Sequence, residues 1–244
     1  MSGLRIELVE DADQLNLIGA DVVTQAIDAT PTSTVVAATG RTPVGLYAEL
    51  GARRIGGFLD ATAISVFQLD EYLGLEDDDR RSLLGWMRRS FLEPLGVTDD
   101  RVVRLPLHGD LEAACSAFDR ALESRGGVDL AILGLGTNGH LGFNEPPSGP
   151  EAPTRVVELS PLTIEANARY WGDTAVVPTR AVTMGLAQLL SARAIVLVVS
   201  GASKRAIVHE VLEGPIVPEV PASFLRKTDA DVTVIVDRAA WGPG

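Results

Sequence analysis

Residues 128–146, Val-Asp-Leu-Ala-Ile-Leu-Gly-Leu-Gly-Thr-Asn-Gly-His-Leu-Gly-Phe-Asn-Glu-Pro, join a short apolar run to a glycine-rich loop. The apolar part, residues 128–133, is typical of a buried strand in a parallel sheet. The glycines that follow allow a sharp turn and a close approach of other groups to the backbone. In a sheet flanked by helices, ligands bind where strands end in such loops. The stretch therefore predicts an α/β fold and the place of its ligand site.

His140 and Glu145 lie five positions apart in this loop, which holds too much glycine for a regular helix. An imidazole and a carboxylate at the end of a strand are suited to proton transfer. A tight turn with a surface histidine has the same local sequence. The loop alone leaves both interpretations open.

Apolar runs alternate with helical patterns along the chain. Strands are predicted at residues 4–9, 34–38, 63–67, 102–105, 128–133, 194–200 and 232–236. Helices are predicted at residues 11–29, 44–50, 82–95, 111–125, 163–170, 180–190 and 203–212. Repeated β–α alternation predicts a doubly wound, mostly parallel sheet with helices on both faces, which is a Rossmann-like arrangement. No internal repeat or low-complexity linker interrupts the pattern, so we expect a single domain over residues 1–244.

The composition limits the classes of function. The chain has 244 residues, of which 46% are hydrophobic, and a formal net charge of −12. Such an acidic chain is a poor nucleic-acid binder, because that function needs a basic face. A small anionic ligand remains compatible with it, since a few cations and backbone N–H groups can hold one phosphate.

The chain shows no sign of secretion or of a disulfide framework. Cys115 is the only cysteine, which excludes an intrachain disulfide and a cysteine-based metal cluster. No stretch is long and uncharged enough to cross a bilayer, and the first residues do not resemble a secretory leader. We therefore expect a cytoplasmic protein with no membrane partner, no nucleic-acid partner and no metal.

The second predicted strand ends in Thr39-Gly40-Arg41-Thr42, and a helix follows at once. Glycine permits close approach of a ligand to the backbone, and the two threonines offer hydroxyl groups. The N–H groups at the start of the helix can bind an anion. The segment is not a P-loop, because it lacks the GK[ST] ending. An ordinary turn with an N-capping threonine has the same composition.

Two acidic residues, Asp70 and Glu71, follow the third predicted strand. Carboxylates at the end of an apolar strand cost free energy unless they are paired or used. One member of such a pair can serve as a base in proton transfer. Two acids at the N-terminus of a helix would give the same pattern.

Two cations lie at further helix positions. Lys204 lies in the first turn of the helix after strand 194–200, where it opposes the helix dipole, which indicates an anionic partner. A solvated surface lysine is the alternative. Arg169, in the helix at 163–170, is a candidate for a second cation or an exposed surface residue.

The motifs ATGxTP, LDEY, GxGxNGHxGFNEP, ANARYW, TR and SGxxK occur in this order between Ile6 and Trp241. In this set and spacing the chain resembles the glucosamine-6-phosphate deaminase family. The related 6-phosphogluconolactonases share the fold and a glycine-rich GH loop but lack FNEP. The resemblance implies conversion of glucosamine 6-phosphate to fructose 6-phosphate and ammonia, in amino-sugar catabolism, without a cofactor.

The resemblance also implies roles for single residues. Asp70 matches the base that moves a proton between C2 and C1 of the opened sugar. His140 would open the sugar ring, and Glu145 would orient it. Some members of the family have aspartate where this chain has Asn138, so Asn138 would orient the histidine by hydrogen bonding alone. The residues expected to bind the substrate phosphate are Thr39, Gly40, Arg41, Thr42, Arg169 and Lys204.

The chain departs from the family pattern in two places. Arg41 replaces a small residue of the phosphate loop, where it would add a cation or point outward. In the segment that forms a lid over the site, Asp77–Leu83, only Ser82 matches the family. The exact amino-sugar phosphate is therefore open.

A third departure concerns regulation. Hexameric, regulated members of the family use two serines after FNEP and a pair of basic residues to bind an allosteric sugar phosphate. This chain keeps Ser148 and Arg155 but has Gly149 and Val157 at the other two positions. The chain also ends soon after its last predicted strand. We expect an unregulated enzyme that is a monomer or a weak homo-oligomer.

Three alternatives remain at this stage. A 6-phosphogluconolactonase would use the same fold, but it has no need for the carboxylates of LDEY. A sugar-phosphate sensor without catalysis would keep the phosphate site and lose the proton-transfer groups. A deaminase for another amino-sugar phosphate, such as the galactosamine epimer, would differ in the lid.

Overall fold

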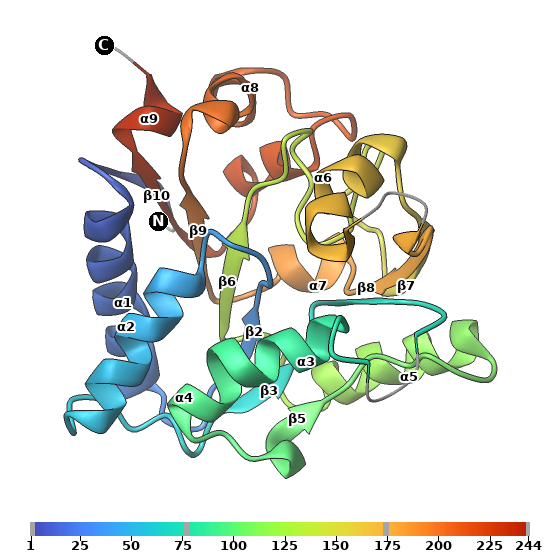
Figure 1. The fold of residues 1–244 in the computed structure, drawn as a ribbon, viewed down its shortest axis with the longest axis horizontal. Coiled ribbons are helices and arrows are strands. Elements are labelled where there is room, and N and C mark those ends of the chain that lie inside the picture. Colours follow the sequence, from blue (N-terminus) through green and yellow to red (C-terminus); the bar gives the residue numbers. More distant parts are fainter. Residues whose placement is uncertain (1–2, 76–78, 173–175, 243–244) are drawn as a thin grey trace.

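A parallel sheet of seven strands forms the centre of the molecule (Figure 1). The computed structural model describes residues 3–75, 79–172 and 176–242. From edge to edge the strands are β1 (Leu4–Val9), β10 (Asp231–Asp237), β9 (Ala194–Val199), β6 (Leu130–Gly134), β2 (Thr34–Ala37), β3 (Ser65–Phe67) and β5 (Val102–Val103). All neighbours in this sheet pair in parallel, as predicted.

Helices cover both faces of this sheet. One face carries α1 (Ala12–Ala29), α2 (Val44–Ile55) and a continuous helical segment made of α3 (Leu83–Met87), a π-helical stretch (Arg88–Leu92) and α4 (Glu93–Leu95). The other face carries α5 (Leu111–Glu123), α7 (Leu186–Leu190) and α8 (Arg205–Glu213), while the short α9 (Arg238–Trp241) follows β10. The predicted doubly wound fold is confirmed, and its extent as one domain over the whole chain stays a prediction.

The central strand β9 is apolar throughout because both of its faces pack against helices. In β9, Val196 and Val198 belong to the core under α1 and α2. The alternate residues Ile195, Leu197 and Val199 belong to the core under α5, α7 and α8. This double burial explains why the strand shows no alternation of polar and apolar residues.

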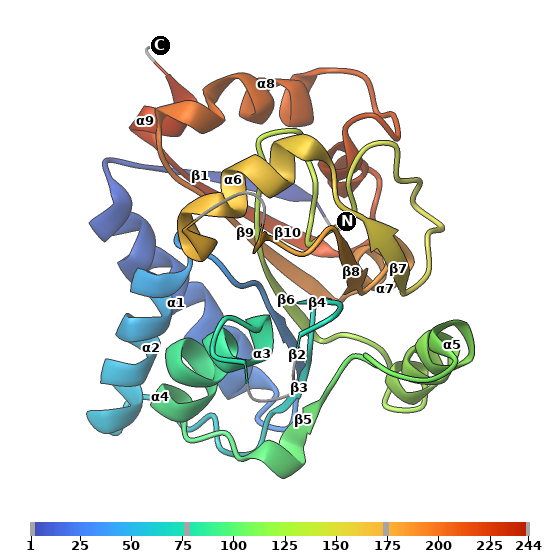
Figure 2. The ribbon, with the colours of Figure 1, turned by 45° about the vertical axis from the view of Figure 1, so that its right-hand side comes forward.

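A second, smaller sheet lies beside the carboxyl ends of the parallel strands (Figure 2). It is antiparallel and contains β4 (Asp70–Tyr72), β8 (Arg180–Thr183) and β7 (Arg155–Glu158), in that order. Helix α6 (Pro161–Trp171) lies between β7 and β8 in the chain. The sheet brings the LDEY motif next to the ends of the large sheet.

The prediction of one helix over residues 180–190 is wrong in its first half. Residues 180–183 form β8, the middle strand of the small sheet, and α7 begins at Leu186. Four residues are too few for periodicity to distinguish a strand from a helix. Pairing with β4 on one side and β7 on the other makes this segment a strand. Gly185 lies between β8 and α7. The chain packs too closely there for a side chain, because a Cβ would lie 2.1 Å from the Ala152 carbonyl oxygen.

Three loops meet at the carboxyl ends of β2, β6 and β9, which are neighbours in the centre of the large sheet in the order β9, β6, β2. Ligand sites in such sheets form at this edge. Among the described residues, no helix is both long enough and apolar enough to cross a membrane.

Candidate active site

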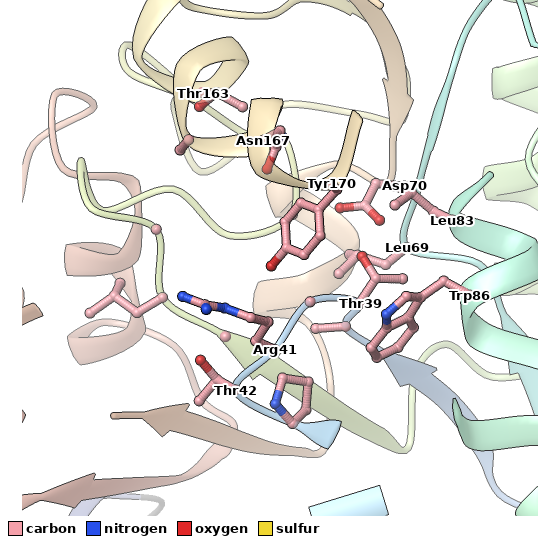
Figure 3. Close-up of a pocket in the computed structure, with 18 of the residues that line it drawn as sticks. Thr39, Arg41, Thr42, Leu69, Asp70, Leu83, Trp86, Thr163, Asn167 and Tyr170 are labelled. Carbon is pink, nitrogen blue, oxygen red and sulfur yellow. The ribbon is translucent and has the colours of Figure 1, made fainter. Parts of the chain in front are cut away.

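A pocket of about 910 Å³ lies over these strand ends. Figure 3 shows Thr39, Arg41 and Thr42 on one side of the pocket and side chains of α6 on the opposite side. Seven of the ten predicted site residues line it: Thr39, Gly40, Arg41, Thr42, Asp70, His140 and Lys204. The structure thus brings together groups that lie up to 165 positions apart in the sequence, from Thr39 to Lys204.

The loop after β2 forms one wall of the pocket. Gly40 has a φ of 106°, a conformation that favours glycine. Helix α2 begins after Pro43 without a side-chain cap from any described residue, so its first N–H groups face the loop. Arg41 is exposed and lines the pocket (Figure 3). A residue that the sequence analysis missed, Tyr47, supports the loop by donating its hydroxyl hydrogen to the Ala38 carbonyl oxygen at 2.8 Å.

Asp70 is the buried carboxylate of the pocket, with 5% of the residue exposed. Its position on β4 is fixed by antiparallel pairing with Thr183 of β8. Its Oδ1 atom is buried and has no hydrogen-bond partner among the described residues. Burial, and then the charge of Glu71, raises the pKa of Asp70 to about 7. A carboxyl group with this pKa is suited to act as a base near neutral pH.

Glu71 points away from the pocket and does not line it. Its carboxylate accepts hydrogen bonds from the backbone N–H groups of Leu83 and Leu84, each at 2.8 Å. The alternative of two acids at the start of a helix is wrong, because both residues belong to strand β4. Asp70 lies in the pocket, whereas the Glu71 side chain contacts the first turn of α3, twelve residues further along the chain.

His140 enters the pocket from the loop after β6. Gly136 makes room for it, since a Cβ at that position would lie 2.3 Å from the imidazole Cδ2. The Nδ1 atom is buried and has no hydrogen-bond partner among the described residues. Burial lowers the pKa of His140 to about 4, with an opposing effect from Glu145 and a reinforcing one from Lys204. The imidazole is therefore neutral at physiological pH.

Two of the predicted site residues near His140 in the chain, Glu145 and Asn138, do not line the pocket. Glu145 is 9% exposed, and its Oε2 accepts a hydrogen bond from the backbone N–H of Ser160, the residue that caps α6, at 2.9 Å. Its Oε1 is buried without a partner among the described residues. Asn138 accepts a hydrogen bond from the backbone N–H of His140 at 3.3 Å, so it contacts the loop and not the imidazole.

Lys204 ends a 3-10 turn, Ala202–Lys204, that leads into α8. It is half-buried and lines the pocket with Ser200 and Ser203. The turn is held by Asp237, which accepts hydrogen bonds from the Ser200 hydroxyl at 2.5 Å and from the Gly201 N–H at 3.1 Å. Lys204 is therefore part of the pocket wall.

Helix α6 contributes more to the site than the sequence indicated. Arg169 belongs to this helix, and its side chain lies outside the described part of the structure. Thr163, Asn167 and Tyr170 line the pocket and were not predicted (Figure 3). The ANARYW motif contained the signal for two of them, but only the packed position of α6 shows which of its residues reach the pocket.

The lid segment is described only in part, because the prediction for Asp77–Leu83 includes residues 77 and 78, which lie outside the described residues. Arg81 forms an ion pair with Asp79 at 2.7 Å. Its guanidinium also lies 4.6 Å from the ring centroid of Trp171, at the end of α6. This contact joins the lid segment to the opposite wall of the pocket.

The pocket is positive although the chain is strongly acidic. Its charged lining residues, apart from Asp70, are Arg41, Arg80, Arg81, Arg89 and Lys204. Among the described residues, no group of three or more His, Cys, Asp or Glu side chains is placed to hold a metal ion. The arrangement can attract an anionic small molecule and place it against a carboxyl group and a neutral imidazole.

The chain is similar to known proteins over most of its length. A family model described as glucosamine-6-phosphate isomerases/6-phosphogluconolactonase matches residues 11–234. Glucosamine-6-phosphate deaminase 2 of Bacillus subtilis is 38% identical and covers 97% of the chain and 96% of its own length. Glucosamine-6-phosphate deaminase of Rhodopirellula baltica is 39% identical, with 97% and 94% covered.

Solved structures separate into two groups. A monomeric glucosamine-6-phosphate deaminase superposes with a TM-score of 0.92 at 36% identity, covering 97% of this chain and 98% of the other. A 6-phosphogluconolactonase from Leishmania guyanensis superposes with a TM-score of 0.75 at 23% identity, with 98% and 97% covered. The second likeness shows a shared fold only.

Proposed function

The chain belongs to the family of glucosamine-6-phosphate isomerases and 6-phosphogluconolactonases, and we propose that it converts glucosamine 6-phosphate and water into fructose 6-phosphate and ammonia. The observation that carries this proposal is a buried Asp70 with a pKa of about 7 in the same pocket as a neutral His140. The full-length similarity to deaminases supports the reaction type.

The proposed phosphate site lies at the mouth formed by the loop after β2 and the turn before α8. Backbone N–H groups of residues 40–42 donate hydrogen bonds to the phosphate, and Lys204 and Arg41 balance its charge. Thr39 and Thr42 add hydroxyl donors. Arg169 completes the set from α6. Binding at this end places the sugar carbons toward Asp70 and His140.

Ring opening is the first proposed chemical step. His140, as a neutral imidazole, accepts the proton of the C1 hydroxyl and returns it to the ring oxygen as the C1–O5 bond breaks. Glu145 stabilises the transient positive charge of His140, because its nearby negative charge favours the protonated imidazole. Asn138 fixes the backbone of the same loop.

Asp70 performs the second proposed step. Its carboxylate removes the C2 proton of the open-chain sugar and delivers it to C1, which moves the unsaturation to C2 through an enolamine. Water then adds at C2 and the amine leaves as ammonia. A base with a pKa near the working pH suits both the removal and the return of the proton.

We further propose a monomer or weak homo-oligomer without allosteric control. A relative of 36% identity is described as monomeric. Arg155, which matches one basic residue of the regulatory site, donates hydrogen bonds to Asn144 at 2.8 Å and to Ser148 at 3.0 Å within its own chain. We also propose a cytoplasmic location, because the charged substrate does not cross a bilayer unaided.

The test is the release of ammonia and fructose 6-phosphate from purified protein given glucosamine 6-phosphate. Equal amounts of the two products, absent in D70N, are expected. 6-Phosphogluconolactone serves as the parallel substrate. Rapid lactone opening without ammonia would replace the proposal with the lactonase reaction. Galactosamine 6-phosphate, run in the same assay, tests how closely the lid selects the sugar.

A further inference from the structure

Glu71 is a buried carboxylate that the proposed reaction leaves without a role. It is 1% exposed, and it lies between two residues that line the pocket, Asp70 and Tyr72. Side chains alternate along a strand, so Glu71 points to the face of β4 opposite the pocket. A buried carboxylate costs free energy unless hydrogen bonds compensate it. Its partners therefore indicate what it does.

Four N–H donors surround the carboxylate of Glu71. Oε1 accepts from the backbone N–H groups of Tyr72 at 2.9 Å and Leu83 at 2.8 Å. Oε2 accepts from the backbone N–H of Leu84 at 2.8 Å and from the side-chain amide of Gln68 at 2.9 Å. All four contacts favour the ionised form, whereas burial opposes it and raises the pKa of Glu71.

Two of these donors belong to the first turn of α3, where N–H groups have no partner within the helix. Helix α3 packs against β4 (Figure 2). It supplies Leu83 and Trp86 to the pocket wall, and Figure 3 shows both on the same side of the pocket as Asp70. The hydrogen bonds of Glu71 thus fix this wall relative to the strand that carries Asp70.

Gln68 holds the carboxylate from the other side. Its amide group donates to the Asp70 carbonyl oxygen at 3.1 Å as well as to Glu71. Its side-chain carbonyl oxygen accepts from the backbone N–H of Leu105 at 3.1 Å, in the segment after β5. The Glu71 carboxylate is therefore tied to the large sheet and to α3 at once.

We propose that Glu71 is a positioning residue of the proposed reaction: its carboxylate fastens the first turn of α3 to β4, and its negative charge acts on Asp70 from the opposite face of the strand. The inference rests on the proposed function, in which Asp70 is the base. It assigns two separable effects to Glu71, one through hydrogen bonds and one through charge.

Other titratable or charged groups near Asp70 do not mask this effect. Tyr47 from α2 and Tyr72 from β4 interact electrostatically with Asp70. The other titratable or charged residues that line the same pocket are His140, Tyr170, Arg41, Arg80, Arg81, Arg89 and Lys204. Burial raises the pKa of both Tyr47 and Tyr72 above their usual range, and the pKa of His140 is about 4. None of these shifts brings another of these groups toward pH 7, and the variants and the titration below separate Asp70 from Glu71.

Two variants separate the effect of the Glu71 charge from the effect of its side-chain length. E71Q keeps the length and removes the charge, so the acid limb of the kcat/KM profile moves to lower pH by roughly one unit, the scale of a neighbouring charge. E71D keeps the charge and shortens the side chain, so that limb stays in place while KM rises. An unmoved limb in E71Q would overturn the effect through charge.

Hydrogen exchange tests the tether without turnover. The amides of Leu83 and Leu84 exchange faster in E71D than in the wild type, whereas amides of β9 are unchanged. Equal exchange at Leu83 and Leu84 would overturn the tether. If the wild type releases no ammonia, the proposed function fails, and this measurement still decides the structural part.

A titration of the wild type covers the case in which E71Q does not fold. The carboxyl ¹³C resonances of Asp70 and Glu71 are followed with pH, and D70N assigns the first of them. Glu71 is expected to ionise at lower pH than Asp70, whose resonance moves near pH 7. Ionisation of Asp70 while Glu71 is still protonated would overturn the action of Glu71 through charge.

Discussion

The two ends of the pocket differ in how far their charged groups are exposed to solvent. The end proposed for the reaction lies at Asp70 and His140, and the end proposed to bind the anion lies at Arg41 and Lys204. At the reaction end, Asp70 and Glu145 are buried, and each keeps a carboxylate oxygen without a hydrogen-bond partner among the described residues. At the anion end, Arg41 is exposed and Lys204 is half-buried. Burial raises the pKa of Asp70 and lowers that of His140 at the first end. The comparison teaches that the groups proposed for proton transfer are shielded from water, whereas the cations proposed to bind the anion keep contact with solvent.

This division makes the expected effects of substitutions unequal. Asp70 and His140 are proposed to take part in bond changes, so their loss is expected to act on kcat. A hydrated cation contributes to the bound and the transition state alike, so its loss acts mainly on KM. Variants at the two ends therefore test whether the pocket is divided in this way.

The largest effect is expected for D70N. The amide cannot take the C2 proton, and kcat falls by roughly 10³- to 10⁴-fold, the upper part of the range for general acid–base catalysis. Binding of a sugar phosphate stays close to the wild type, as measured by calorimetry with fructose 6-phosphate. D229N, at an exposed position far from the pocket lining, is the matched control. Near-normal turnover by D70N would contradict the assignment of the base.

A smaller loss is expected for H140Q, because ring opening also proceeds slowly in water. Turnover of the ring-closed substrate falls by roughly 10²-fold, the lower range for an acid–base group. An open-chain analogue of the substrate is slowed less, which a comparison of the two rates would show. H209Q is the control, since His209 contacts the Trp241 carbonyl oxygen away from the pocket. Equal slowing of both substrates would remove the ring-opening role.

K204A should act at the anion end. Loss of a charge-assisted contact with phosphate raises KM by roughly 10- to 100-fold and leaves kcat nearly unchanged. Steady-state kinetics measure both parameters. The other lysine of the chain, Lys227, is exposed and does not line the pocket, so K227A is the control. A fall in kcat with constant KM would show that the two ends are not separate in function.

The pH profile of the wild type is expected to follow Asp70. The pKa of Asp70 is raised to about 7, and the base works only when ionised. Activity is therefore present above this pKa and falls about tenfold per pH unit below it. His140 adds no further limb between pH 5 and 8, because its pKa lies near 4. A kcat/KM profile that stays flat down to pH 5.5 would contradict the pKa of Asp70.

The smallest effect is expected for R81A, at the rim of the pocket. Arg81 joins Asp79 to Trp171 through an exposed ion pair and a cation–π contact, and contacts of this kind contribute little in water. KM should rise about twofold, as steady-state kinetics would show. R238A removes a similar exposed ion pair, with Glu10, and is the control. A rise of KM beyond tenfold would place Arg81 on the substrate itself.

The sequence predicts the reaction end and part of the anion end because both lie at strand ends. Buried strands are recognisable as apolar runs, and the segments that follow β3, β6 and β9 hold Asp70, His140 and Lys204. Local sequence also shows which chain positions turn sharply. These residues are therefore found without knowledge of packing.

Other parts of the site depend on packing that local sequence does not encode. Whether Asp70 or Glu71 faces the pocket is set by the register of β4 against β8, and β8 itself was predicted as a helix. Which side of α6 reaches the ligand is set by its docking, so Asn167 and Tyr170 were missed. The same holds for Asn138, whose amide contacts backbone in place of the imidazole.

The proposed phosphate site and the proposed base, Asp70, are held by different sheets. The loops after β2 and β9 belong to the large parallel sheet, whereas Asp70 belongs to the small antiparallel one. Substitutions within the small sheet can thus alter the chemistry while the anchor for a phosphorylated sugar persists. Solved structures of 6-phosphogluconolactonases at 19–23% identity share the fold. For protein engineering, the small sheet is the place to seek new reactions on the same anchored substrates.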